Sequence, residues 1–295
     1  MYRLLAAWLI VSGLALAGPH RPAAWPLLAL LHLVGVGACL AADRRVRWAQ
    51  TGRAPQPNAL LDWAPLLIMP ALYAELAVLN SALWGGRYFD DLVIGWEQAL
   101  FGGQPSRDLA NAAPWPALSE ALHFSYLSYY ALIFVPPLLI WLRRSRAALR
   151  DAVFTVMLVF LAHYLFFVYF PVQGPRYLFP APGGEAIAGY PFRDLAHRVL
   201  ESGSSRGAAF PSSHVGVGVA ASFVAWRHLR PLAPVVALLT VGLALGAVYG
   251  GFHYGVDALA GAALGAGLAG VAPRVRDRME RRGAANAPPR RPANA

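Results

Sequence analysis

Phe210-Pro211-Ser212-Ser213-His214 is the segment from which the fold of this chain can be worked out. It lies where a polar loop with several arginines, residues 171–209, meets an apolar run, residues 215–226. A second segment, Tyr249-Gly250-Gly251-Phe252-His253-Tyr254-Gly255-Val256-Asp257, likewise precedes an apolar run, residues 258–272. Two histidines that each open an apolar run at a membrane boundary predict two neighbouring helices with one shared site.

The residue types in and around these segments are those that bind phosphate. Ser212 and Ser213 are good N-cap residues, and a helix N-terminus binds anions through its unpaired N–H groups. The loop adds Gln173-Gly174-Pro175-Arg176, and a guanidinium binds two phosphate oxygens at once. We therefore expect Arg176, Ser212 and Ser213 to bind phosphate.

The spacing of His253 and Asp257 predicts a nucleophile. They lie at i and i+4, so that on a helix the carboxylate can reach one imidazole nitrogen and fix the tautomer. The other nitrogen is then free to attack phosphorus. We expect a phosphohistidine intermediate on His253, with His214 protonating the leaving oxygen and later activating the acceptor. The expected reaction uses no metal and no cofactor.

These three segments, in this order, resemble those of the type 2 phosphatidic acid phosphatase superfamily over roughly residues 169–272. In that superfamily a Pro-Ser-x-His motif supplies a phosphate-binding serine and an acid/base histidine. A His-x-x-x-Asp motif supplies the nucleophilic histidine and its orienting aspartate. By position in the motifs, these residues are Ser212, His214, His253 and Asp257. The resemblance implies a six-helix phosphatase-like core.

Two positions depart from the superfamily pattern. The third motif commonly has an arginine six residues before its histidine, where this chain has Ala247. The first motif normally has a lysine seven residues before its arginine, where this chain has Tyr169. Both changes remove positive charge from the phosphate site. The pattern resembles the inositolphosphotransferase (inositol phosphorylceramide synthase)-like branch, so the expected acceptor is either an alcohol such as inositol or another headgroup, or water.

The composition is that of an integral membrane protein. Of the 295 residues, 57% are hydrophobic and 14% are charged, which is far from a soluble composition. A helix of about 20 apolar residues spans a bilayer. The chain has eight apolar runs, at residues 4–17, 24–42, 63–84, 118–142, 152–170, 211–226, 232–249 and 255–272. We therefore expect an all-α polytopic membrane bundle with about eight transmembrane helices.

The arginines predict the topology. They cluster in loops between alternate runs, and cytoplasmic loops carry the positive charge. We therefore expect both termini in the cytoplasm and the site on the outer face of the cytoplasmic membrane. The same loops account for the net charge of +10 without a nucleic-acid partner. The first run is either a span, which we favour, or a cleaved signal peptide.

Three regions follow from this pattern. Residues 1–62 are expected to form an N-terminal membrane hairpin with a cytoplasmic loop, residues 63–272 the lipid phosphatase or phosphotransferase domain, and residues 273–295 a basic, disordered cytoplasmic tail. Asp90 to Phe101 is amphipathic but too short to span, so it is expected in the outer interface. Residues 192–202 are expected to form a short helix.

Several polar residues have two interpretations. Glu75 lies in the middle of an apolar run, where it either lines a substrate pocket or is a hydrogen-bonded packing residue. Tyr126 and Tyr130 share a helix face. They likewise either line a substrate pocket or are packing residues of the bundle. The loop also carries three arginines, of which either one replaces the missing phosphate cation or all pair with carboxylates nearby: Arg193, Arg198 and Arg206.

The expected partners are a lipid phosphate, membrane lipids and an alcohol acceptor, while the oligomeric state is left open. A metal site built from the histidines is the weaker reading, because a serine pair and an arginine favour an anion. The alternative function is a non-enzymatic lipid or solute transporter that uses the same polar cavity. In that case Glu75 and the tyrosines would line the pathway and His253 would be dispensable.

Overall fold

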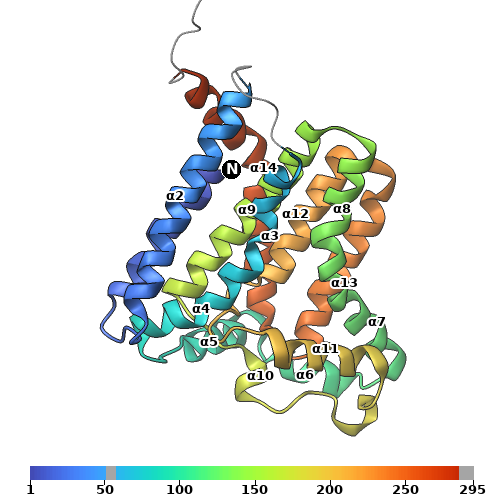
Figure 1. Cartoon of the computed structure of the whole chain (residues 1–295). Helices are drawn as coiled ribbons and strands as arrows, with labels where there is room; N and C mark the ends of the chain where they lie inside the picture. The colour runs from blue at the N-terminus through green and yellow to red at the C-terminus, as the bar shows by residue number, and fades with distance from the viewer. Residues whose placement is uncertain (51–57, 286–295) are drawn as a thin grey trace, which may run out of the picture.

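The computed structural model describes residues 1–50 and 58–285, and over these ranges the chain is a bundle of helices without a β-strand (Figure 1). The predicted all-α polytopic fold is confirmed. The longer elements are α1 (Tyr2–Gly13), α2 (Trp25–Gln50), α3 (Leu60–Leu67), α4 (Met69–Trp84), α5 (Asp90–Phe101), α6 (Pro105–Ala112), α7 (Pro116–Leu127), α8 (Tyr129–Arg143), α9 (Arg146–Tyr169), α11 (Pro191–Gly203), α12 (Ser213–His228), α13 (Ala233–Tyr249) and α14 (Gly255–Ala285). Short turns of helix are η1 (Leu14–Ala17), α10 (Pro175–Leu178), η2 (Gly184–Ile187) and η3 (Arg230–Leu232).

The described residues contain five helices that are long and apolar enough to cross a membrane. These are Trp25–Ala49, Leu60–Trp84, Arg146–Tyr169, Arg230–Tyr249 and Gly255–Arg281, and the bent pair α7 and α8 makes a sixth if it is one span. The chain is therefore a multi-pass membrane protein. The other two predicted runs form shorter helices, α1 with η1 and the 16-residue α12. Helix α12 is short because it begins at a polar serine pair and ends before Arg230-Pro231.

The bend between α7 and α8 has a local cause. The two helices meet at 47° around Ser128, whose hydroxyl donates a hydrogen bond to the backbone oxygen of Ser125 at 2.6 Å. Such a bond back to the preceding turn bends helices. Tyr126 and Tyr129 lie on either side of the bend, and both rings contact the ring of His214. The break therefore lets two successive helices present side chains to one point.

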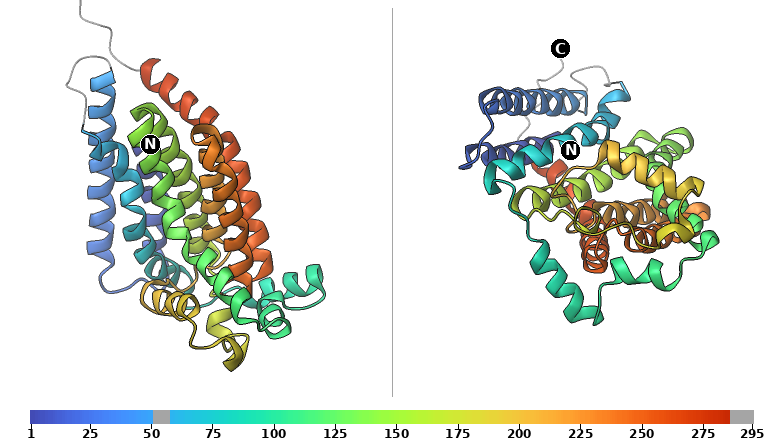
Figure 2. Two further views of the ribbon diagram at one scale, coloured as in Figure 1. Left: turned by 90° about the vertical axis from the view of Figure 1, so that its right-hand side faces the viewer. Right: turned by 90° about the horizontal axis from the view of Figure 1, so that it is seen from below.

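The two ends of the bundle differ in character. Helices α5, α6, α10 and α11 gather at one end, which we call the site end, and the N-terminus and the last turns of α14 lie at the opposite end (Figures 1 and 2). We call this opposite end the arginine end. There, buried Asp62 binds Arg146 and Arg150 at 2.6 and 2.7 Å. Buried carboxylates need such partners, so these ion pairs fix α3 against α9.

Helices α12 and α14 pack at backbone distance. A Cβ atom added to Gly265 would lie 2.5 Å from the backbone oxygen of Gly216, and one added to Gly261 would collide with the backbone of Ser212. The small residues therefore bring the N-termini of these helices together.

Three regions outside the core compare with the sequence predictions as follows. The amphipathic segment forms α5 with the expected bounds, and residues 192–202 lie within α11. Helix α14 continues to Ala285, past the expected start of the tail at residue 273. One arginine of this extension, Arg276, is held by carboxylates, since it binds Asp151 at 2.7 Å and lies 3.8 Å from Glu280. Residues 286–295 lie outside the described part.

Candidate active site

Three side chains form a hydrogen-bonded row at the site end. Nε2 of His253 lies 3.3 Å from Nδ1 of His214, and Nε2 of His214 lies 3.3 Å from the hydroxyl of Tyr126. His253 precedes α14, His214 is in the first turn of α12, and Tyr126 is near the end of α7. The predicted meeting of the two histidines is thus what the structure shows, and Tyr126 extends the row.

The surroundings of His253 select its tautomer. Nδ1 faces two acceptors, the backbone oxygen of Ala209 at 3.1 Å and Oδ2 of Asp257 at 3.5 Å. We therefore assign the proton to Nδ1, which leaves a lone pair on Nε2. That lone pair accepts from Nδ1–H of His214 in the described state. The backbone of Ala209 is closer than the carboxylate, so the two share the orienting role that spacing assigns to Asp257 alone.

Asp257 also organises the backbone around both histidines. Its Oδ2 accepts the N–H of Tyr254 at 2.8 Å, and its backbone oxygen accepts the N–H of Ser212 at 2.9 Å. The side chain is 0% exposed. One residue therefore caps α14 and ties the start of α12 to it.

The two serines have different positions. The hydroxyl of Ser212 accepts the N–H of Val215 at 3.4 Å, so Ser212 is the N-cap of α12. Ser213 lines the large cavity beside His214. The N-terminus of α12 thus faces the histidine pair, where its N–H groups and dipole favour an anion.

Arg176 lies in the short helix α10, which precedes α11. Its Nη1 donates to the hydroxyl of Ser204 at 3.0 Å, and Ser204 also bonds the hydroxyl of Tyr177 at 2.6 Å. A second arginine, Arg206, lies 5.1 Å from the centre of the Tyr177 ring, with Arg176 at 4.9 Å. Within the described residues neither guanidinium is ion-paired with a carboxylate. Two cations without a counter-charge therefore lie together beside the site.

Two carboxylates of α5 contact the site, and sequence reasoning missed both. Asp90 accepts the N–H groups of Gln173 and Gly174, each at 2.9 Å, and Glu97 accepts the N–H of Val256 at 3.3 Å. Burial raises the pKa of Glu97. The amphipathic pattern showed the helix but not that its acidic side faces protein.

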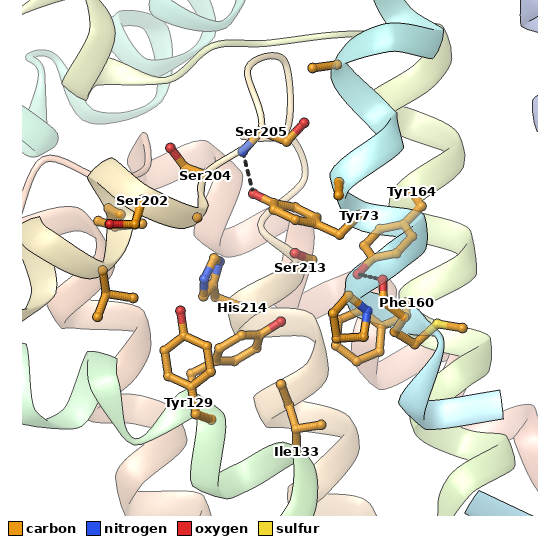
Figure 3. Close-up of a pocket in the computed structure, with 18 of the residues that line it drawn as sticks. Tyr73, Tyr129, Ile133, Phe160, Tyr164, Ser202, Ser204, Ser205, Ser213 and His214 are labelled. Atoms are coloured by element: carbon orange, nitrogen blue, oxygen red, sulfur yellow. Dashed lines mark hydrogen bonds between the residues drawn. The ribbon is translucent and has the colours of Figure 1, made fainter. Parts of the chain in front are cut away.

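A cavity of about 780 Å³ leads to His214 and Ser213 (Figure 3). Its walls come from α3 and α4, α8 and α9, and its rim from the end of α11 and residues 203–206. Most of the lining is apolar or aromatic, including Tyr73, Tyr129, Ile133, Phe160 and Tyr164. Tyr73 holds the rim, because its hydroxyl accepts the N–H of Ser205 at 3.1 Å.

The remaining candidates divide between the cavity and the core. Tyr130 lines the cavity, whereas Tyr126 is not among its lining residues. Glu75 does not line it and instead bonds Nε2 of His32 on α2 at 2.9 Å. His163 is buried against Gly216, as a packing residue.

A smaller polar cavity of about 150 Å³ is lined by Arg176 together with Arg107, His197 and Glu201. Burial, with Arg193 nearby, lowers the pKa of His197 to about 4. His197 is therefore neutral near neutral pH. In the described residues no group of three or more His, Cys, Asp and Glu side chains is arranged to hold a metal ion.

A membrane bundle that places a histidine pair beside two unpaired arginines has side chains suited to binding a phosphate group. Comparison with protein families makes this specific, because the family model of the PAP2 superfamily matches residues 91–271. The chain belongs to the PAP2 superfamily. Such membership fits a lipid phosphatase or phosphotransferase in general. Comparisons with curated proteins and with solved structures gave no match.

Proposed function

We propose that this protein transfers a phosphoryl group from a lipid phosphate or phospholipid, through a phosphohistidine on His253, to an alcohol or to water. The observation that carries the proposal is the contact of 3.3 Å between His253 and His214 at the end of the large cavity. The lone pair on Nε2 of His253 thus faces a histidine that can deliver a proton, and it becomes available for attack once His214 gives up this hydrogen bond. Asp257 and Ala209 hold the nucleophile in that orientation.

The shape of the cavity supports a lipid substrate. It has the size of a ligand pocket, and most of its lining is apolar or aromatic, while Ser213 and His214 are among its polar residues. A lipid would place its chain between α4, α8 and α9 and its phosphate at the N-terminus of α12. Part of the lining of this cavity comes from α3 and α4, which precede the region matched by the family model.

The reaction has two steps. In the first, Nε2 of His253 attacks phosphorus, the bond to the lipid oxygen breaks, and that oxygen takes a proton from His214. The proposal requires His214 to enter this step doubly protonated. In the second, His214 takes the proton of the acceptor hydroxyl as its oxygen attacks phosphorus, and the P–N bond breaks. His253 regains its lone pair and His214 its proton, so both residues return to their starting state.

Arg206 is the residue that we propose in place of the missing cations. Tyr169 donates a hydrogen bond to Val11 on α1, away from the histidines. Ala247 is buried, and its backbone oxygen accepts the N–H of His253 at 3.0 Å. Arg206 lines the large cavity with Ser213 and His214. Arg176 and Arg206 would therefore supply the positive charge that binds the phosphate oxygens.

The acceptor and the orientation are the finer parts of the proposal. The altered cation pattern is the reason to favour the inositolphosphotransferase-like branch over a simple phosphatase. The arginine end carries the charge that favours the cytoplasm. We therefore propose that both termini are cytoplasmic and that the site faces outward.

The test uses purified protein in lipid vesicles without added metal. Radiolabelled polyprenyl phosphate, diacylglycerol phosphate and phosphoinositides are offered in turn, with and without inositol and other alcohols. We expect label to move in the wild type and in His20→Ala, a control at an exposed histidine, but not in His253→Ala. Label on free phosphate identifies a phosphatase, and label on an alcohol identifies a transferase. Turnover by His253→Ala at the wild-type rate would refute the mechanism.

A further inference from the structure

Asp90 connects the two segments that carry Arg176 and His253. Its Oδ2 accepts the N–H of Gln173, and its Oδ1 accepts both the N–H of Gly174 and the hydroxyl of Tyr254, at 2.9, 2.9 and 3.1 Å. The residue is only 5% exposed. A carboxylate with this much of its accepting capacity used holds its donors firmly, because charge-assisted hydrogen bonds are the stronger kind.

The two bonds to the loop set the direction of Arg176. Gly174 has φ of +95°, a conformation that side chains rarely adopt. Pro175 follows and restricts φ of its own residue. A Cβ atom on Gly174 would lie 3.2 Å from the backbone oxygen of Phe252, so the loop packs directly on the segment before His253. With its start fixed by Asp90, this short stiff path leaves Arg176 little freedom of direction.

Glu97 extends the same contact along α5. It lies seven residues after Asp90, two turns along the helix and on the same face. Its Oε2 accepts the N–H of Val256 at 3.3 Å, and the residue is 0% exposed. Helix α5 therefore contacts the first turn of α14 through Glu97 and the segment before Arg176 through Asp90.

We propose that Asp90 is a positioning residue that aligns Arg176 with His253 for phosphoryl transfer, a role that rests on the proposed function. The carboxylate would not touch the substrate. It would act by holding the N–H groups of Gln173 and Gly174 on one side and the hydroxyl of Tyr254 on the other. Misplacement of a binding group by about 1 Å can lower a rate on the order of 100-fold.

The test is a double-mutant cycle in the vesicle assay. Asp90→Asn keeps the size of the side chain, but its amide group cannot accept the N–H of Gln173 and of Gly174 together. We expect it to lower kcat/KM by about 10- to 100-fold. The matched control Asp91→Asn, at an exposed neighbour on the same helix, should stay within about twofold. Tyr254→Phe, which removes only the third bond, should cost about two- to tenfold.

The cycle separates positioning from mere support of the fold. In an Arg176→Gln background, Asp90→Asn should lower kcat/KM by less than about threefold, because the group that it positions is gone. Equal losses in both backgrounds would overturn the proposal. A wild type that moves no label would instead refute the proposed function itself.

Hydrogen exchange supplies a readout that is independent of activity. Asp90→Asn should speed amide exchange in the peptide covering residues 171–178 by about tenfold, and Asp91→Asn should not. Unchanged exchange in Asp90→Asn would contradict the proposal that Asp90 holds the segment before Arg176 in place, even if activity fell.

Discussion

Tyr126→Phe tests the hydrogen-bonded row with the least disturbance. The change removes one hydroxyl, which lies 3.3 Å from Nε2 of His214. The ring contacts remain, with centroids 5.2 Å from His214 and 4.7 Å from Phe252. A neutral hydrogen bond contributes about 0.5–1.5 kcal/mol net. If the hydroxyl serves His214 in the transition state, kcat should fall roughly 2- to 13-fold.

The hydroxyl suits this role because it can both donate and accept. It donates to Nε2 when His214 carries its proton on Nδ1, and it accepts from Nε2–H when His214 is doubly protonated. Phenylalanine can do neither. The effect should therefore appear in kcat, with KM nearly unchanged, since the substrate itself is not in contact with this hydroxyl in the proposed mechanism.

The assay is the initial rate of label transfer from the best lipid donor at saturating concentration. Tyr130→Phe is the matched control, because Tyr130 lines the same cavity and its hydroxyl forms no hydrogen bond within the described residues. We expect its kcat to stay within about twofold of the wild type. An equal loss in both variants would show that the cavity tolerates no change of either tyrosine. No loss in Tyr126→Phe would remove Tyr126 from the acid/base row.

Two further predictions use residues near the arginine pair. Arg206→Gln should raise KM for lipid phosphates by about tenfold through loss of a charged hydrogen bond, whereas Arg198→Gln on α11 should leave KM within about twofold; equal KM values in the two variants would contradict the assignment of Arg206. His197 should make stability depend on pH: its pKa falls from 6.5 to about 4 in the folded protein, so the unfolded state binds the proton more tightly and the Tm in detergent should fall as pH drops from about 6.5 to about 4. His197→Gln should flatten the Tm profile over that window, and an unchanged slope would assign the effect to other groups.

The sequence was sufficient for features that depend on short spacing. The i, i+4 spacing of His253 and Asp257 predicted their contact, and the apolar runs predicted the helices. The serine pair before α12 predicted its N-cap. Each of these features is local, because one helix or one helix end determines it.

Features that depend on distant partners could not be predicted. The closest acceptor for Nδ1 of His253 is the backbone oxygen of Ala209, 44 residues earlier. Glu75 finds His32 on another helix, 43 residues away. From the sequence, the acidic face of α5 is predicted to face solvent. Hydrophobic periodicity shows which side of a helix is apolar, but it does not show whether the polar side contacts another part of the protein. The contact of α5 with the segment before Arg176 depends on the tertiary fold, which brings both segments next to the start of α14.

The distance between the two histidines depends on the axial register of α12 against α14. Contacts at three levels along the helix pair fix that register. At the site end, the N–H of Ser212 donates to the backbone oxygen of Asp257. In the middle, Gly216 and Gly265 bring the backbones into contact. At the arginine end, Asp151 of α9 binds both His228 of α12 and Arg276 of α14, each at 2.7 Å.

A slip of one residue between these helices would move one histidine by about 1.5 Å along the axis. That is larger than the misplacement of about 1 Å that can cost a rate on the order of 100-fold. The ion pairs of Asp151 lie at the end of the bundle opposite to the site, yet they oppose this slip together with the glycine contacts. In the proposed mechanism, these distant ion pairs would contribute to catalysis by holding the two helices in register. The 3.3 Å contact between His253 and His214 is a property of the whole helix pair.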